Sequence, residues 1–197
     1  MRGMSKKAIT LKMLVLITSV MFCSSLLAQQ LPERQGFFDI RSASISLNGG
    51  VFELDARLQL ILSDEALNAL SSAVPLTIEL EVEVIRVRRF LPDDPAPLLN
   101  FMYELEYRPL SQRYIVRNLN SGNQDSFSTL YSALNNLGRI QALPIIDDAV
   151  LDLDSDYRVR LRARLSTRQY PAALRFLFFW RSQWQLESEW YEWMLER

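Results

Sequence analysis

Three side chains that carry much of enzyme chemistry are scarce in this 197-residue sequence. It contains no histidine and one cysteine, Cys23, and its lysines all stand at positions 6, 7 and 12. Beyond residue 28 every cation is therefore an arginine. That part of the chain cannot form a disulfide, a zinc site of Cys and His ligands, a lysine Schiff base, a cysteine nucleophile or a Ser-His-Asp triad. It also lacks imidazole, the side chain that normally changes charge near neutral pH.

The first 28 residues have the layout of a secretory signal peptide. Basic residues come first, residues 13–27 form an apolar run that is short for a membrane span, and Ala28 precedes two glutamines. We expect export to the periplasm, with cleavage after Ala28, and one exported β-rich domain over residues 29–197. Leu26 is large for a cleavage signal. The alternative is therefore an uncleaved N-terminal segment that anchors the protein to the inner membrane, which is the one membrane contact we expect.

The exported part of the chain is mildly acidic. Without the first 28 residues it holds 18 arginines against 23 aspartates and glutamates, a net charge of −5. Nucleic-acid binding requires a basic face strong enough to displace counterions. We therefore expect no nucleic-acid partner.

Apolar and polar residues alternate strictly from position 76 to position 84, which indicates one long strand with one buried face and one solvent-exposed face. The face expected to be exposed to solvent carries glutamates at positions 79, 81 and 83. At Val84 and Ile85 the alternation changes phase. One inserted residue has that effect, so the sequence predicts a β-bulge there.

Similar alternation predicts more strands, and helical spacing predicts helices, along the rest of the chain. The further strands are expected at residues 43–47, 52–60, 101–107, 113–119, 157–165 and 184–190. Asn48, Gly49 and Gly50 suit a tight turn between the first two strands. Ser63 begins one helix, Gly138 ends a second over residues 128–137, and residues 172–180 form an apolar helical turn or two. The predicted fold class is mainly β (α+β), a single antiparallel domain of about seven strands with two or three short helices, for which a two-sheet sandwich is one arrangement.

Several segments together resemble one uncharacterised family of exported bacterial proteins, domain of unknown function 4390. These segments are LSDEAL, VPLTIELEVEV, LSQRYIVRNLNSG, FSTLYSALNNLGRI, DYRVRLRARL and WQLESEWYEW. The resemblance covers nearly the whole exported chain. It implies no assigned reaction and no catalytic residues, and it suggests a gene neighbourhood that often includes a membrane sensor kinase.

Four arginines, at positions 158, 160, 162 and 164, form the entire polar face of one predicted strand. Guanidinium groups pair well with oxyanions, so Arg158, Arg160, Arg162 and Arg164 are a candidate surface for a phosphate, a sulfated glycan or a lipid headgroup. The favoured interpretation is different. Glutamates at positions 79, 81, 83, 104 and 106 lie on the polar faces of other strands, and opposite charges on neighbouring strands attract each other.

Carboxylates offer two further candidate sites. Asp152, Asp154 and Asp156 match the start of a calcium-binding loop, but the glycine and the glutamate that such a loop also needs are replaced by Tyr157 and Ala163. Electrostatic capping of the arginine strand is the favoured role for these aspartates. Alternating glutamates could act as a hydrolytic acid–base pair, although the sequence has no other catalytic motif. We expect no cofactor and no bound metal.

The C-terminal segment is rich in aromatic residues. The alternation places Trp184 and Trp190 on the apolar face of the final predicted strand and gives Tyr191 and Trp193 the opposite parity. Tyr191 and Trp193 are therefore candidate interaction residues. Our leading hypothesis is a non-catalytic exported interaction or accessory domain whose partner is an envelope protein, with a sensor-kinase ectodomain suggested by the family resemblance alone. The alternative is an envelope hydrolase, or a domain that binds carbohydrate or anionic lipid through surface carboxylates and arginines.

Overall fold

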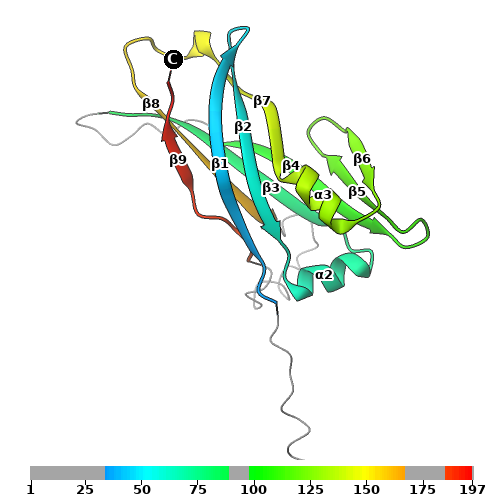
Figure 1. Ribbon diagram of the computed structural model, residues 1–197. Coiled ribbons are helices and arrows are strands. Elements are labelled where there is room, and N and C mark those ends of the chain that lie inside the picture. The colour runs from blue at the N-terminus through cyan, green and yellow to red at the C-terminus, as the bar shows by residue number, and fades with distance from the viewer. Residues whose placement is uncertain (1–33, 89–97, 167–184, 197) are drawn as a thin grey trace, which may run out of the picture. The chain divides into compact units, whose positions relative to one another are not determined.

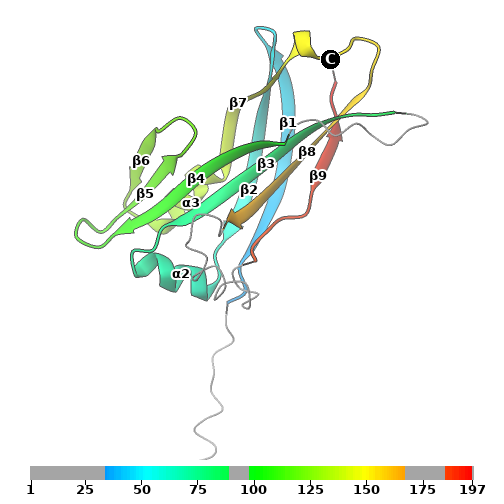
Figure 2. The same ribbon diagram turned by 180° about the vertical axis from the view of Figure 1, so that it is seen from behind.

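Two antiparallel β-sheets, packed face to face, form the architecture of the protein. The computed structural model describes residues 34–88, 98–166 and 185–196, which contain nine strands and two α-helices. Figures 1 and 2 show these elements from opposite sides. The predicted class, a mainly β (α+β) antiparallel domain with short helices, is confirmed, and of the arrangements considered the chain adopts the one with two sheets. No helix within the described ranges has the length and apolar character needed to cross a membrane.

The smaller sheet has three strands in the order β1 (Phe37–Asn48), β2 (Val51–Ile61) and β7 (Arg139–Asp147). Strands β1 and β2 form the predicted hairpin, in which Asn48 pairs with Val51. The two turn residues have positive φ angles, 59° at Gly49 and 86° at Gly50. Glycine adopts these angles without steric cost, and they match the twist of the two strands.

The larger sheet has six strands and is built around the long strand that the alternation predicted. Its order is β6 (Gln124–Phe127), β5 (Arg113–Asn118), β4 (Leu99–Arg108), β3 (Leu76–Arg86), β8 (Tyr157–Ser166) and β9 (Tyr191–Met194). Strand β3 therefore lies between β4 and β8, as Figure 2 shows. Its pairing with β8 runs without interruption from Thr77 to Arg86, so the bulge predicted at Val84 and Ile85 is wrong. The alternation of apolar and polar residues changes phase there because the side chains of Val84 and Ile85 are both buried.

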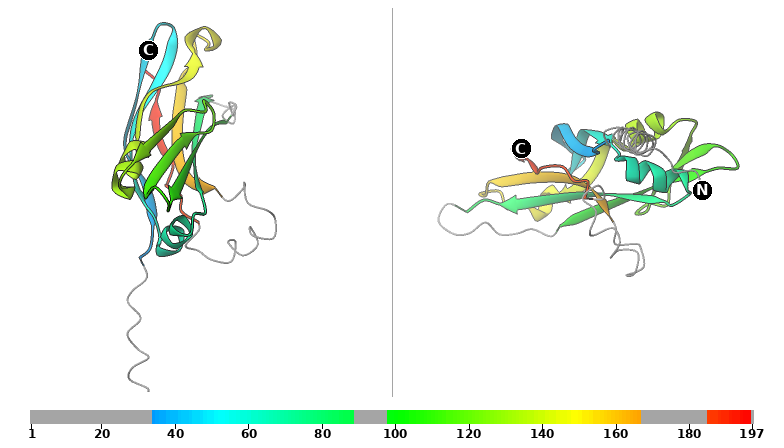
Figure 3. Two further views of the ribbon diagram at one scale, coloured as in Figure 1. Left: turned by 90° about the vertical axis from the view of Figure 1, so that its right-hand side faces the viewer. Right: turned by 90° about the horizontal axis from the view of Figure 1, so that it is seen from below.

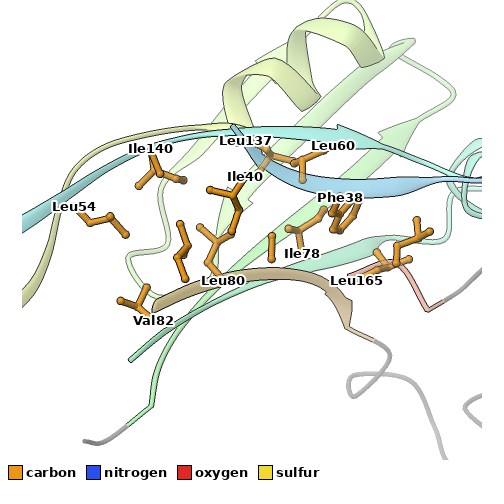
Figure 4. Packing of buried hydrophobic residues seen from close by; sticks show 14 of the residues in the cluster. Phe38, Ile40, Leu54, Leu60, Ile78, Leu80, Val82, Leu137, Ile140 and Leu165 are labelled. Atoms are coloured by element: carbon orange, nitrogen blue, oxygen red, sulfur yellow. The ribbon is translucent and has the colours of Figure 1, made fainter. Parts of the chain in front are cut away.

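The hydrophobic core fills the space between the two sheets (Figure 3, left). Phe38 and Ile40 of β1 point toward Ile78 and Leu80 of β3, as Figure 4 shows, and all four are buried. Each sheet thus buries one face against the other, the arrangement that alternating strands require.

Both described helices begin with the expected type of cap. In α2 (Asp64–Ser71) the Ser63 hydroxyl accepts a hydrogen bond from the Ala66 N–H, and in α3 (Leu130–Leu137) the Thr129 hydroxyl does the same for Ser132. Gly138 ends α3 as predicted, but with a φ of −77°. A side chain there would place Cβ 2.4 Å from the Leu58 carbonyl oxygen, so close packing explains this glycine. The helix predicted at residues 172–180 lies outside the described residues.

Two strands were missed and one is displaced. Strand β7 carries Pro144, a left-handed Ala142 with φ 48°, and two register shifts against β2, so its sequence does not alternate. Strand β6 has four residues, too few for a clear pattern. The final strand was expected at residues 184–190, whereas β9 begins at Tyr191. Residue 184 lies outside the described part of the chain.

Candidate functional site

The arginine strand lies directly beside the glutamate strand, and the two strands form a row of ion pairs. Three arginines of β8 are register partners of three glutamates of β3: Arg160 with Glu83, Arg162 with Glu81, and Arg164 with Glu79. We call these six residues the arginine–glutamate ladder. Its N···O contacts measure 2.6 Å for Arg160 and Glu83, 2.5 Å for Arg162 and Glu81, and 3.0 Å for Arg164 and Glu79. The pairing favoured from the sequence is therefore present.

Two of the three glutamates on this face of β3 are buried, contrary to the expectation of a solvent-exposed face. Glu79 and Glu81 retain 1% and 2% of their accessible surface, while the side chains of Arg162 and Arg164 retain 25% and 21%. The carboxylates thus lie beneath their partners, and the guanidinium groups form the outer layer. Burial of such charges is tolerated because each one has a close partner of opposite sign.

Trp190 covers part of the ladder. Its ring centroid lies 4.4 Å from Cζ of Arg160 and 4.4 Å from Cζ of Arg162, within the range of a cation–π contact. The sequence pattern had placed this tryptophan on the apolar face, and that prediction is wrong. The C-terminal segment instead brings Trp190 to the charged face of the sheet.

An extra residue in the C-terminal segment explains this reversal. Glu187 is bridged to Arg164, and Tyr191 is paired with Leu161. Between those two pairs the C-terminal segment advances by four residues and β8 by three. Glu189 and Trp190 therefore stand opposite one residue of β8, as in a β-bulge. The parity of every later residue is reversed relative to the simple alternation.

Tyr191 and Trp193 consequently face the core. They pair with Leu161 and Val159 of β8 and pack against the buried cluster. Their ring centroids lie 5.7 Å apart. The Trp193 Nε1–H group is buried without a hydrogen-bond partner. Both residues support the strand that carries the charged face, and their rings contribute to the core.

Arg158 stands at the end of the ladder. Its Nη1 atom lies 3.7 Å from Glu192 Oε2, so β9 supplies one neighbour of opposite charge. In the acidic connection before β8, Asp152 Oδ2 accepts a hydrogen bond of 2.7 Å from Arg86 of β3. Within the described residues, no three acidic side chains lie close enough together to hold a metal ion.

The other carboxylates considered for hydrolysis are also paired with arginines. Glu104 Oε1 lies 3.3 Å from Arg117 Nη1, and Glu106 Oε1 lies 3.4 Å from Arg108 Nε. A hydrolytic acid–base pair needs two carboxylates that flank a space for the substrate. The glutamate rows of β3 and β4 face arginines instead.

Two hollows lie beside β7, and the sequence analysis found neither. The larger one, about 320 Å³, is lined by Tyr103, Val116, Asn118, Asn123, Asp125, Asn136, Leu137, Arg139, Ile140, Gln141 and Leu143. Burial raises the pKa of the Tyr103 phenol above its ordinary value of 10.0. The smaller hollow, about 230 Å³, lies on the outer face of the three-stranded sheet. Both depend on strand pairing between β7 and distant segments, which no local pattern reveals.

A comparison with protein families finds one match. The model of the family described as "Domain of unknown function (DUF4390)" matches residues 36–194 of the chain. The match spans all nine described strands and the arginine–glutamate ladder. Neither the curated proteins nor the solved structures provide a match.

Proposed function

The chain belongs to the DUF4390 family, and from its arginine–glutamate ladder we propose that it acts as a non-catalytic exported interaction or accessory domain. The observation that carries this proposal is the neutralisation of the glutamate rows. Glu79, Glu81 and Glu83 each have an arginine within 3.0 Å, so these carboxylates are engaged in holding β3 and β8 together. Charge pairing of this kind has a structural role. The signal-peptide layout supports a place of action in the periplasm or at the outer face of the inner membrane.

The surface proposed for the contact is the outer layer of the ladder. It combines Arg160 and Arg162 with Trp190, which are the types of side chain most enriched among residues that dominate binding energy. The arginines are held in place by their glutamates and by the Trp190 ring. Little side-chain freedom is then lost when a partner binds, which favours affinity. The proposed partner is an envelope protein, and the family resemblance suggests the ectodomain of a sensor kinase.

Site-specific photo-cross-linking tests this proposal. A photoreactive residue at exposed Glu189, next to Trp190, should cross-link one envelope protein in intact cells. The same residue at Tyr131 on α3, which is 79% exposed, should not cross-link that protein and is the matched control. The purified partner should bind the wild type directly and bind the Trp190→Ala variant at least tenfold more weakly. Cross-linking that is equal at both positions, or that yields no envelope protein, would contradict the proposal.

A second candidate function rests on the larger hollow. It combines the ring of Tyr103 with amide side chains at positions 118, 123, 136 and 141, a set of groups suited to the hydroxyls and the apolar face of a sugar. Asp125 is the one carboxylate among its lining residues, which fits carbohydrate binding better than two-carboxylate hydrolysis.

Saturation-transfer NMR with cell-wall disaccharides tests this candidate. The Asn136→Leu variant should lose the signal, because Asn136 lines the hollow. The Asn135→Leu variant should keep it, because Asn135 is an exposed neighbour on the same helix that does not line the hollow. An unchanged signal in Asn136→Leu would exclude binding at this hollow.

A further inference from the structure

Two arginines of the three-stranded sheet differ from the other arginines on described strands. The arginines of β1, β3, β4, β5 and β8 each have a hydrogen bond or an ion pair. Within the described strands, Arg57 of β2 and Arg139 of β7 have side chains with neither, and both are exposed. Their charge is therefore available to a ligand.

The fold places these two arginines opposite each other. Arg57 and Arg139 are register partners in β2 and β7, and Ser42 of β1 is the partner of Arg57 on the other side. Directly opposed residues in antiparallel strands have Cβ atoms about 5 Å apart, and like charges at that distance destabilise the pairing. Their chain neighbours Ala56 and Ile140 are buried, so both arginines lie on the outer face of the sheet.

A hollow of about 230 Å³ lies beside this pair. It is lined by Ser42, Ser44, Asp55, Ala56, Arg57, Arg139, Ile140 and Gln141. The one carboxylate in this set is held by the bulged part of β7, where Asp55 Oδ1 accepts a hydrogen bond of 3.2 Å from the Ala142 N–H. Asp55 forms no ion pair with either arginine of the hollow. The row from Ser42 through Arg57 to Arg139 thus presents a hydroxyl and two unneutralised guanidinium groups.

We propose that Arg57 and Arg139 form an oxyanion-binding site that takes a phosphate or sulfate group. Each guanidinium presents parallel N–H donors that match two oxygens of such a group, and the Ser42 hydroxyl can donate to a third. A divalent anion between the arginines also removes their mutual repulsion. The hollow is larger than the group itself, so a phosphoryl or sulfate ester of a small molecule or of a lipid headgroup fits the same chemistry. The arginines of β8 cannot serve in this way because glutamates already neutralise them.

NMR titration of the ¹⁵N-labelled protein with sodium phosphate, at constant ionic strength kept with sodium chloride, tests the site. Saturable shifts of the Nε–H signals of Arg57 and Arg139 are expected. Arg57→Gln and Arg139→Gln should each weaken phosphate binding about tenfold or more, the range for loss of charged hydrogen bonds. Arg41→Gln is the matched control. It removes one charge from β1 of the same sheet, where Arg41 pairs with Asp39, and should leave the affinity within about twofold.

Melting temperatures show whether a variant that fails to bind phosphate is still folded. Without phosphate, Arg139→Gln should melt at or above the wild-type temperature, because the substitution relieves the repulsion from Arg57. Phosphate should raise the melting temperature of the wild type and leave that of the variant unchanged. Shifts that are equal in phosphate and in chloride, or a double variant that binds phosphate like the wild type, would overturn the proposal.

Sedimentation with vesicles distinguishes the two sources of the group. Binding to phosphatidylglycerol vesicles but not to phosphatidylcholine vesicles, lost in Arg57→Gln, would assign the site to an anionic lipid headgroup. Saturation by phosphate without vesicle binding would assign it to a soluble phosphoryl or sulfuryl compound. Both outcomes support the site. The absence of phosphate binding together with the absence of vesicle binding would refute it.

Discussion

Arg164 contacts two buried carboxylates at once, since its Nη2 atom lies 3.0 Å from Glu79 Oε2 and 2.9 Å from Glu81 Oε1. Replacing Arg164 with Met would deprive both buried charges of this guanidinium. We expect the free energy of unfolding to fall by about 3 kcal/mol, as for other broken buried pairs, measured by urea denaturation. Arg108→Met is the control, because its contact with Glu106 is exposed and should change the value by less than about 1 kcal/mol. Equal effects of the two substitutions would show that burial adds nothing to the ladder.

Because of Tyr103, we expect the free energy of unfolding to depend on pH in the alkaline range. Burial raises the pKa of its phenol in the folded protein above 10.0, so the unfolded chain releases this proton at a lower pH. The stabilisation from the neutral phenol is complete below the unfolded pKa and is lost as the pH rises through the folded pKa. The ultraviolet absorbance of ionised tyrosine can be followed against pH in the wild type and in Tyr103→Phe. The difference between the two curves should have its midpoint above pH 10.0. A midpoint at or below that value would contradict the effect of burial.

At the scale of residues, the sequence predicted the pairing of charges better than their surroundings. Opposite charges at alternate positions were enough to predict contacts such as the one between Arg162 and Glu81. The burial of Glu81 was not predictable, because Arg162 and Arg164, which contact its carboxylate, are brought to it by the pairing of distant strands. The charges of Arg57 and Arg139 showed no local sign of a shared position, since the two residues meet through the register of β2 and β7.

The bulge in the C-terminal segment sets the faces of the last strand. Deleting Glu189 removes the extra residue and leaves Tyr191 and Trp193 on the core face, so we expect a change of less than about 1 kcal/mol in unfolding free energy. Deleting Glu192 instead moves Trp193 away from the core, and we expect a loss of at least about 2 kcal/mol. Chemical denaturation of both variants tests the assignment. The reverse order of the two effects would place the bulge elsewhere.

At the scale of elements, strands with strict alternation were predicted and irregular ones were not. Strands β2, β3, β4 and β8 each bury one face against the other sheet, so their sequences carry the period of two. Strand β7 lies at the edge of its sheet, where Pro144 and the left-handed Ala142 are tolerated, and tertiary pairing rather than local preference makes it a strand. The bulge at Glu189 and Trp190 likewise depends on how the C-terminal segment pairs with β8. The displacement by a single residue reversed the predicted buried and exposed faces of that segment.

At the scale of the whole molecule, export predicts a defined mature chain. We expect intact mass spectrometry of protein from the periplasmic fraction to give the mass of a chain that begins at Gln29, the residue after the proposed cleavage position. A membrane-bound protein that retains the first 28 residues would support the anchored alternative. A full-length protein in the cytosolic fraction would contradict export.

The need for a second layer was predictable, with two packed sheets as one arrangement that meets it, whereas the location of the hollows was not. Alternating strands with one apolar face require a second layer, and the core between β1 and β3 provides it. The larger hollow arises where β7, α3 and the β5–β6 hairpin meet, and the smaller one lies over β1, β2 and β7, so the lining residues of each come from segments far apart in the chain. Such sites depend on strand order, which alternation alone does not determine.

The interruptions in β7 also change what the edge of the smaller sheet presents to solvent. An edge strand presents unpaired N–H and C=O groups that can template a strand from another molecule. Pro144 has no N–H to offer, and the turn of the backbone at Ala142 breaks the line of acceptors. This rim of the smaller sheet is therefore a poor template for the stacking that leads to fibrils.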